Sequence, residues 1–233
     1  MNARTIFLMA GCATLSGCGM ETATGPARQE TRTIERDNAE SARVELQMGA
    51  GELRVEGGAA ALAEAAFHYN VPVWKPEVRY HSFAGRADLS IRQPAGTAHI
   101  GHAQYDWDLR LNNDMPTDFK LHFGAGEAHL DLGSLNLRSV EVEMGVGEIH
   151  MDLRGMPRQD YSVRVRGGIG EATINLPANA GIYAKAEGGL GEIKAQGLRQ
   201  EERRWVNDWY GSDRPQVRVD VSGGIGQINL IAE

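Results

Sequence analysis

The chain has 233 residues, of which 42% are hydrophobic, and it carries a formal net charge of −7. This length and apolar content suffice for one domain with a sizeable core. An acidic balance spread along the chain argues against nucleic acid or an anionic membrane surface as the main partner, because both repel negative charge.

The first residues have the composition of a secretory signal. Met1 to Arg4 provide a positive start, a short apolar run extends from Thr5 to Leu15, and Leu15-Ser16-Gly17-Cys18 follows. The apolar run is too short to span a bilayer. The last four residues resemble the lipobox of bacterial lipoproteins, in which the cysteine is acylated and becomes the first mature residue. We expect residues 1–17 to be a signal peptide and Cys18 to anchor the protein by its lipid to the outer membrane or the outer face of the cell membrane. The alternative is an ordinary signal peptide with an incidental cysteine.

A polar segment follows, from Gly19 to about Ser41, and it holds almost no large apolar residue. Such a segment cannot bury enough apolar surface to fold, so we expect residues 18–41 to be a flexible tether and residues 42–233 to form one domain. Cys12 lies inside the expected signal peptide. If Cys18 carries lipid, no thiol is left in the mature chain for a disulfide bond or a metal–thiolate site.

The remainder of the chain repeats one phrase, Gly-x-Gly-Glu followed by an alternating apolar stretch. From Gly124 onward the first glycines are 21, 23, 21 and 35 residues apart, which predicts stacked rungs of about 21 residues with one enlarged member. The copies begin at Gly49, Gly124, Gly145, Gly168, Gly189 and Gly224, the last with Gln227 in place of the glutamate.

Apolar residues change their spacing at each glycine phrase. In the copy at Gly145, Val140 and Val142 lie five and three positions before it, whereas Ile149 and Met151 lie four and six positions after it. Such alternation marks a strand with one buried face, and the slip from odd to even positions requires a bulge or a bend. Each rung is therefore predicted to be two short strands that meet at a glycine corner, and stacked rungs bury a shared apolar interior.

The chain between the first two copies is predicted to be extended. Ala59–Phe67 alone could form a short helix, but the alternation that continues to Tyr69 favours a strand, and prolines interrupt residues 71–80. Arg86–Ile91 has the pattern of a rung that has lost its glycine corner. Ile100–Leu111 alternates as another strand.

The enlarged interval, Arg199–Arg214, is an insertion that carries the densest aromatic cluster of the chain. Insertions in solenoids form loops on one face, often the face that binds. Its aromatic residues either fold back over the apolar edge of the last rungs or form an exposed contact patch for a partner. The candidate binding residues are Trp205, Trp209 and Tyr210.

The order of these phrases resembles the toast-rack domain family of bacterial envelope proteins, which includes the extracytoplasmic part of the cell-wall-active antibiotics response proteins. The resemblance covers about Ala42 to Glu233, and it rests on Gly49-Ala50-Gly51-Glu52-Leu53, Tyr69-Asn70, Trp74-Lys75-Pro76-Glu77-Val78 and Val206-Asn207-Asp208 before the last Gly-Gly-x-Gly. It implies an all-β, right-handed, single-stranded β-solenoid (toast-rack) with Gly-x-Gly-Glu corners, and a role in sensing or scaffolding without established enzyme chemistry. The antibiotic-response members are anchored by several membrane helices, whereas this chain has only the signal for a lipid anchor. Membrane-embedded contact with a sensor kinase therefore does not follow from the resemblance.

Glutamates occupy the same position in five rungs, namely Glu52, Glu127, Glu148, Glu171 and Glu192. With rungs about 4.8 Å apart, a file of carboxylates repels itself unless cations or the exposed corner amides relieve it. The functional interpretation is a row of weak calcium sites, and the structural one is hydrogen bonding at the corner. We favour the structural one, because calcium-binding solenoids alternate Asp with Gly more densely than this chain does.

His129 and His150 fall at the same place in neighbouring rungs and are predicted to stack as an outward pair, while His99 and His102 stand near Asp106. A zinc site needs three or four convergent ligands, and an outward pair supplies two. We therefore expect solvated histidines and no metal or cofactor.

No catalytic constellation stands out in the sequence. Gly167-Gly168-Ile169-Gly170 is not a dinucleotide fingerprint, because the phrase recurs and a strand follows it. There is no phosphate loop and no signal of a Ser-His-carboxylate triad. We therefore expect a non-enzymatic, lipid-anchored envelope protein, a binding or scaffolding module linked to envelope-stress sensing, with an envelope protein or glycan as partner and no nucleic acid. The alternatives are a polysaccharide hydrolase or lyase on a β-solenoid and a self-assembling structural solenoid.

Overall fold

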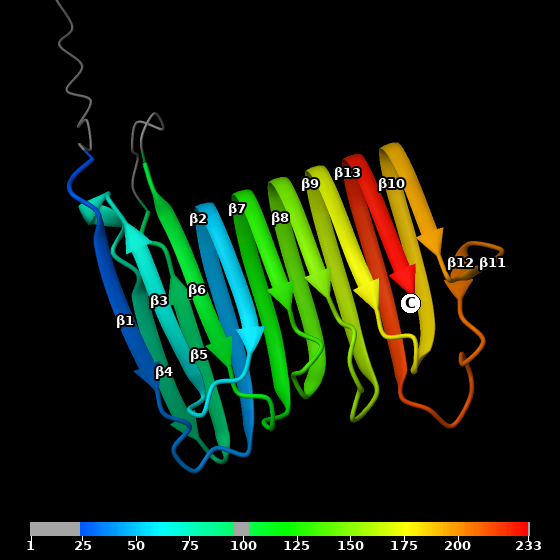
Figure 1. The fold of residues 1–233 in the computed structure, drawn as a ribbon, viewed down its shortest axis with the longest axis horizontal. Coiled ribbons are helices and arrows are strands. Elements are labelled where there is room, and N and C mark those ends of the chain that lie inside the picture. Colours follow the sequence, from blue (N-terminus) through cyan, green and yellow to red (C-terminus); the bar gives the residue numbers. More distant parts are fainter. Residues whose placement is uncertain (1–23, 96–102, 233) are drawn as a thin grey trace, which may run out of the picture.

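Strands make up most of the computed structural model, which describes residues 24–95 and 103–232. One short 3₁₀ turn, η1 (Pro72–Trp74), interrupts them, and in this part of the chain no helix has the length and apolar character to cross a membrane. The strands lie side by side in one open stack, so the predicted all-β solenoid is confirmed (Figure 1). The expected signal peptide, Cys18, His99 and His102 lie outside the described residues.

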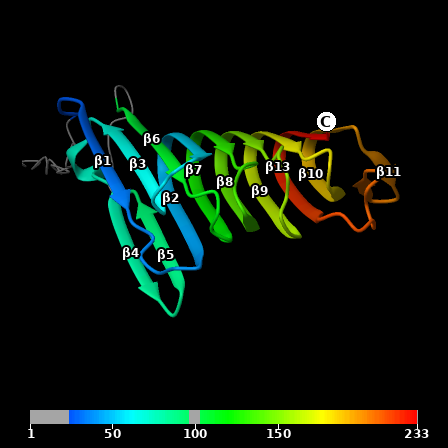
Figure 2. The same cartoon turned by 60° about the horizontal axis from the view of Figure 1, so that its bottom comes forward.

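Six long strands form the rungs, and each bends at its glycine phrase into a first arm before the corner and a second arm after it. They are β2 (Ser41–Gly57), β7 (Thr117–Asp131), β8 (Leu137–Asp152), β9 (Tyr161–Leu176), β10 (Gly181–Gln196) and β13 (Gln216–Ala232). From β2 to β9 the chain runs up the rear layer, over the corner and down the front layer, which makes the coil right-handed (Figure 1). Figure 2 shows the rungs as successive turns of this coil.

The second glycine of each phrase is required by both conformation and space. Neighbouring rungs pair in parallel and in register, so that Gly147 and Gly170 stack on each other. Their φ angles are 136° and 141°, a region that residues with a side chain rarely adopt. A Cβ built on Gly170 would lie 1.7 Å from the carbonyl oxygen of Gly147. Glycine is therefore needed at the corner, because a side chain would push neighbouring rungs apart.

The last rung along the chain does not close the stack. β13 lies between β9 and β10 and pairs in parallel with both, so that Val219 meets Val163 on one side and Ala184 on the other. Figure 1 shows β13 in red between the yellow and orange rungs. The last two rungs therefore do not stack in chain order. Every rung presents the same glycine and apolar positions, so the spacing alone does not specify which rungs become neighbours.

A divided rung lies on the other side of β2. β5 (Arg86–Arg92) pairs with the first arm of β2 and β6 (Tyr105–Leu111) with its second arm, both in parallel. The prediction of a rung without a glycine corner is confirmed here. β4 (Glu77–Phe83) pairs antiparallel with β5, and β3 (Ala63–Tyr69) pairs antiparallel with β6. The parallel stack therefore ends in antiparallel strands at this side.

The outermost strand at this end is β1 (Arg28–Ile34), which pairs antiparallel with β3 along its whole length. The prediction of a flexible tether over residues 18–41 is therefore wrong for this segment. Its sequence lacks a clear apolar alternation because β1 is an exposed edge strand, in which only Ile34 is buried. Charged residues such as Arg28 and Arg32 are typical of a sheet edge, since they discourage pairing with another chain.

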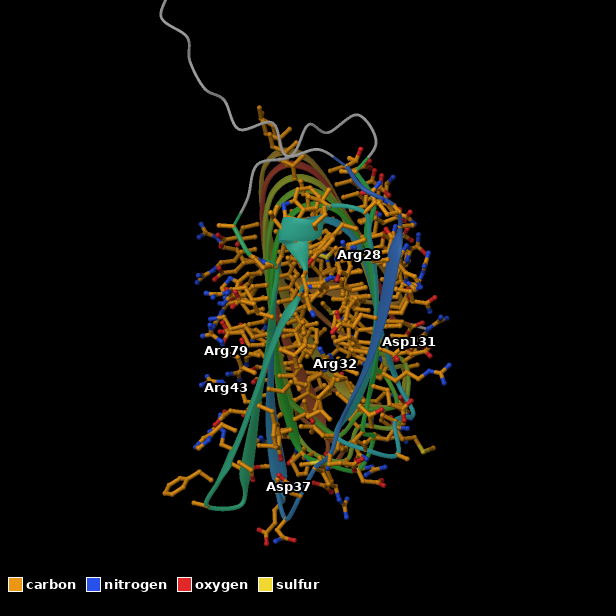
Figure 3. All side chains as sticks on the ribbon, turned by 90° about the vertical axis from the view of Figure 1, so that its left-hand side faces the viewer. Arg28, Arg32, Asp37, Arg43, Arg79 and Asp131 are labelled. Atoms are coloured by element: carbon orange, nitrogen blue, oxygen red, sulfur yellow. The ribbon has the colours of Figure 1, made fainter. Side chains whose placement is uncertain are left out.

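Apolar side chains from the two layers fill the interior, while charged residues such as Arg43 and Asp131 lie on opposite outer faces (Figure 3). Toward the N-terminal end the interior is filled by large rings, and Phe67 and Trp107 meet edge to face with centroids 5.5 Å apart. The position just before each corner holds a large buried side chain in the first three rungs and glycine in the last three, in the order Met48, Phe123, Met144, Gly167, Gly223 and Gly188. The interior is thus less completely filled beneath the last corners.

Candidate functional site

The insertion after β10 divides the three predicted aromatic residues between two environments. β11 (Arg199–Glu201) and β12 (Arg204–Val206) form an antiparallel hairpin, and β12 pairs with the first arm of β10. Trp205 packs against the apolar core. Trp209 and Tyr210 lie in the turn that follows and are 41% and 39% exposed. Trp205 therefore covers the apolar core, whereas Trp209 and Tyr210 are exposed to solvent.

Two side-chain amides hold this turn in place. Asn207 accepts a hydrogen bond from the backbone N–H of Ile182 (2.8 Å) and donates one to the carbonyl oxygen of Ala180 (2.7 Å). Gln216 donates from Nε2 to the carbonyl oxygen of Arg214 (2.8 Å). The exposed rings are therefore presented by a backbone that the rungs already fix, which reduces the entropy lost when a ligand binds.

Cationic side chains surround the exposed rings. The guanidinium carbon of Arg214 lies 3.5 Å from the ring centroid of Trp209. The rings of Tyr183 and Tyr210 are 5.5 Å apart, and the guanidinium carbon of Arg204 lies 5.6 Å from the first and 5.7 Å from the second. Together with Arg218, which lies 5.5 Å from the Tyr183 ring, these residues define the aromatic–arginine patch: Tyr183, Arg204, Trp209, Tyr210, Arg214 and Arg218.

Two guanidinium groups of this patch are available to an anion. Arg204 is paired with Glu201 at 3.1 Å, and this hydrogen bond raises the pKa of Arg204. Arg214 and Arg218, in contrast, have no carboxylate of residues 24–95 or 103–232 within 4.0 Å. Arg214 donates one hydrogen bond from Nη1 to the carbonyl oxygen of Asn179 at 3.1 Å, and the other N–H groups of a guanidinium stacked on a ring can bind a carboxylate or a phosphate. The patch therefore combines apolar ring faces with donors suited to negative groups.

Sequence reasoning missed Tyr183 and Arg218. They stand opposite each other because β13 lies beside β10, and Tyr210 joins them through the insertion. The alternation of each first arm marks both positions as outward, but it carries no information about the order of the rungs. The patch thus depends on the order of the rungs, which the repeats do not encode.

A second surface runs along the outer face of the second arms. The predicted file of glutamates is present, and in stacking order this carboxylate column holds Asp106, Glu52, Glu127, Glu148, Glu171, Gln227 and Glu192. Two residues further along each strand, a partner column holds Asp108, Arg54, His129, His150, Thr173, Asn229 and Lys194. The insertion of β13 places neutral Gln227 between the last two glutamates and so separates their charges.

Partner-column side chains relieve the repulsion between the carboxylates. Glu52 pairs with Arg54, and Glu192 pairs with Lys194 at 3.1 Å. Glu171 accepts a hydrogen bond from Asn229 at 2.7 Å. Within the described residues, relief therefore comes from partner-column side chains of the same or the neighbouring rung, and the expected bonding of these glutamates to the corner amides is not what the structure has.

At the two middle rungs the partners are imidazoles. The rings of His129 and His150 stack with centroids 5.1 Å apart and planes 13° apart, as predicted. Nε2 of His129 lies 2.8 Å from a Glu127 oxygen, while Nε2 of His150 lies 3.4 Å from a Glu148 oxygen and 3.9 Å from a Glu127 oxygen. Among the described residues, two overlapping groups of three have ligand atoms close enough to hold a metal ion: Glu52, Glu127 and His129, and Glu127, Glu148 and His150.

An open groove of about 700 Å³ lies beside the corners on the first-arm side. Its polar lining includes His122, Glu143 and Arg166. Nδ1 of His122 lies 3.1 Å from a Glu143 oxygen, and Arg166 lies 3.9 Å from the same carboxylate. These side chains pair with one another across neighbouring rungs.

An open stack of bent strands with side-chain columns on its outer faces defines a repeat protein of the β-solenoid class. The match to a known family is more specific. Residues 23–175 match the N-terminal domain of toast_rack, DUF2154. This match spans more than half of the chain, and the chain belongs to the toast-rack family.

One solved structure shares the fold over most of the chain. The crystal structure of a candidate cell adhesion protein from Clostridium sporogenes is similar with a TM-score of 0.87 and 32% identity, over 89% of this chain and 100% of that chain. A candidate adhesin from Bacteroides fragilis matches over 91% of this chain and 100% of that chain, but with 11% identity and a TM-score of 0.34, which is too low to carry an argument. No curated protein sequence matches the chain.

Proposed function

We propose that this chain is a non-enzymatic, lipid-anchored binding module of the bacterial cell envelope, and that its aromatic–arginine patch binds an anionic envelope glycan. The observation that carries the proposal is the pair of exposed rings, Trp209 and Tyr210, on a fixed turn flanked by guanidinium groups. Aromatic faces pack against the apolar faces of sugar rings, and guanidinium groups bind carboxylates or phosphates in a bidentate manner.

The expected localisation and the similar solved structure support this proposal. The lipobox-like Leu15-Ser16-Gly17-Cys18 is the basis for a lipid anchor on the envelope. The Clostridium sporogenes protein, described as a candidate for cell adhesion, shares the fold at 32% identity, and adhesion requires a surface that binds. The resemblance to antibiotic-response proteins extends the proposal to envelope-stress sensing, in which occupancy of the patch reports the state of the envelope.

The test is binding of the full-length protein, purified in detergent, to an immobilised anionic envelope glycan. The double variant Trp209→Ala with Tyr210→Ala should lose most of the binding, because it removes both exposed ring faces while the core stays intact. A matched control is Phe83→Ala, since Phe83 is 74% exposed in β4 at the far end of the stack. Binding should also weaken with salt, because guanidinium–anion contacts at a surface are screened.

Three outcomes would count against the glycan assignment. Binding by the double variant equal to that of the parent would place the binding face elsewhere. A melting temperature that falls by several degrees with binding retained would make Trp209 and Tyr210 a cover. Retrieval of an envelope protein without glycan would reassign the partner.

The enzymatic alternative requires a carboxyl group that can act as an acid. A glycoside hydrolase uses two carboxyl groups, one of which has a raised pKa and acts as a general acid. The carboxyl groups with a shifted pKa in the described residues are Glu77, Asp152 and Glu201, and hydrogen bonds from arginine lower the pKa of all three. None of these three groups is therefore suited to be the general acid of a glycoside hydrolase.

One observation favours the self-assembling alternative, namely that the second arm of β10 has β13 on one side and no strand of the described residues on the other. At the opposite end of the stack, antiparallel β1 and β4 are outermost. The outermost strand β1 carries exposed charged residues such as Arg28 and Arg32, which discourage pairing with another chain, so we expect no filament. A single monomer boundary in sedimentation velocity is the expected result, and a concentration-dependent series of larger species would contradict it.

A further inference from the structure

The negative charge of the carboxylate column is compensated by different side chains in the middle of the column and at its ends. Toward the ends, glutamates stand beside Arg54 and Lys194, whose positive charges are permanent at neutral pH. In the middle, Glu127 and Glu148 stand beside imidazoles. An imidazole differs from a guanidinium because it can give up its proton and offer a nitrogen lone pair to a metal ion. The other rungs of the same column thus serve as an internal comparison, and only the two middle rungs combine carboxylate charge with nitrogen ligands.

We propose that Glu127, Glu148, His129 and His150 form a binding site for one divalent transition-metal ion such as Zn²⁺. Glu127 is in register with Glu148, and His129 is in register with His150, on the adjacent parallel strands β7 and β8. The four side chains therefore form a two-by-two grid on one outer face of the sheet. Because both strands lie inside the stack and are paired on both sides, the grid has a rigid base.

The distances fit a tetrahedral ion. Bonds of about 2.0–2.1 Å to nitrogen and oxygen place neighbouring ligand atoms of a tetrahedron about 3.4 Å apart. Nε2 of His150 lies 3.4 Å from Glu148 and 3.9 Å from Glu127, and one atom from each of the three lies within 4.8 Å of the others. Nε2 of His129 is 2.8 Å from Glu127, and its half-exposed ring can turn to become the fourth ligand.

The donor set selects the class of metal. Two imidazole nitrogens with two carboxylate oxygens suit Zn²⁺, Co²⁺, Ni²⁺ or Cu²⁺, whereas Ca²⁺ takes six to eight oxygens. Sequence reasoning counted two ligands because it considered the glutamates and the histidines as separate rows. The register places the two rows side by side and doubles the number of ligands.

The metal site is independent of the proposed glycan patch. The grid lies on the second arms of β7 and β8, whereas the patch is built from the insertion and the first arms of β10 and β13. Loss of glycan binding therefore says nothing about the metal, and loss of metal binding says nothing about the glycan.

The experiment is a calorimetric titration of the chelator-treated, full-length protein in detergent with ZnCl₂. One Zn²⁺ per chain is expected. His129→Gln and His150→Gln should each weaken binding about tenfold or more, and Glu148→Gln, which keeps the size of the side chain, should do so as well. The matched control is His122→Gln, because His122 also stands beside a carboxylate on the outer face, 3.1 Å from Glu143, and belongs to no ligand cluster of the described residues.

Cobalt supplies a readout of geometry. Co²⁺ bound by the parent should give the intense visible absorption of a tetrahedral site, and His150→Gln should lose it. If the variants melt at the same temperature as the parent, their loss of binding comes from the missing metal-ligating side chain and not from unfolding. Failure of the parent to bind Zn²⁺, equal affinity in His150→Gln, or equal loss in His122→Gln would each overturn the proposal. Displacement of the bound Zn²⁺ by equimolar Ca²⁺ would overturn it too, because it would mean an all-oxygen site.

Discussion

Two glycines in β9, three residues apart, should respond to the same substitution with opposite signs. Gly170 has a φ of 141°, and a Cβ there would lie 1.7 Å from the carbonyl oxygen of Gly147. Gly167 lies outside the left-handed region, and a Cβ there would meet no atom within 4 Å. Alanine is therefore excluded at Gly170 by conformation and by the neighbouring rung, whereas the interior has room for it at Gly167.

The magnitudes follow from these two environments. Gly170→Ala incurs backbone strain of about 1–3 kcal/mol, and displacement of the next rung weakens ladder hydrogen bonds worth about 1 kcal/mol each, so we expect a loss of about 3 kcal/mol. In a domain of this size that corresponds to a fall in Tm of about 6–12 °C. Gly167→Ala restricts the unfolded chain without strain in the native one, and should add about 0.4–1 kcal/mol, or about 1–4 °C.

The assay is thermal unfolding of the full-length parent and both variants, followed by the circular dichroism of the β-sheet, with urea midpoints as a second measurement. Because both positions lie in one rung, each variant is the control for the other. If the Tm of Gly170→Ala equals that of the parent, the corner backbones can separate at no cost in free energy and the steric argument fails. If Gly167→Ala melts below the parent, the interior beneath the corner is closer packed than the distances indicate.

Two further predictions concern the anchor and the response to alkali. Cys18→Ser should leave the precursor uncleaved or release the protein from membranes, since serine provides no thiol for the lipid; a variant that fractionates and migrates like the parent would contradict the anchor. Burial raises the pKa of the Tyr161 phenol well above its usual value, so the native state keeps this proton at a pH where the unfolded chain loses it. The resulting stability is fully present below about pH 10 and is lost as the pH rises further, so the urea midpoint should fall above that pH and Tyr161→Phe should flatten the fall. Equal slopes in both proteins would exclude the phenol as the cause.

Local features of the fold could be predicted because their causes are local. The slip of alternation between Val142 and Ile149 marks the corner, since a strand can change its buried face only at a bend and only glycine fits a bend of this φ. The lost corner of the divided rung was predictable for the same reason, because Arg86–Ile91 alternates without a glycine phrase. In both cases a few adjacent residues determine whether the strand bends at a corner.

Features that depend on distant residues were not predictable from spacing. β1 was missed because an edge strand with one buried residue has no apolar pattern. The position of β13 was missed because the glycine and apolar positions that the rungs share do not specify their order. The same reason explains the site: Trp209 and Tyr210 were found as an aromatic cluster in an insertion, whereas Tyr183 and Arg218 meet only when the order of the rungs is known.

The place of β13 in the stack affects how the chain completes its fold. The second arm of β10 has its ladder with β13 alone, and β13 is synthesised after every other rung. β9 and β10 therefore wait with open edges until residues Gln216–Ala232 have arrived between them. A chain cut before Gln216 leaves the backbone groups of two rungs unpaired and exposes their apolar columns, which is the state that proteases degrade. The native order of the rungs is therefore complete only after the last of them has been synthesised.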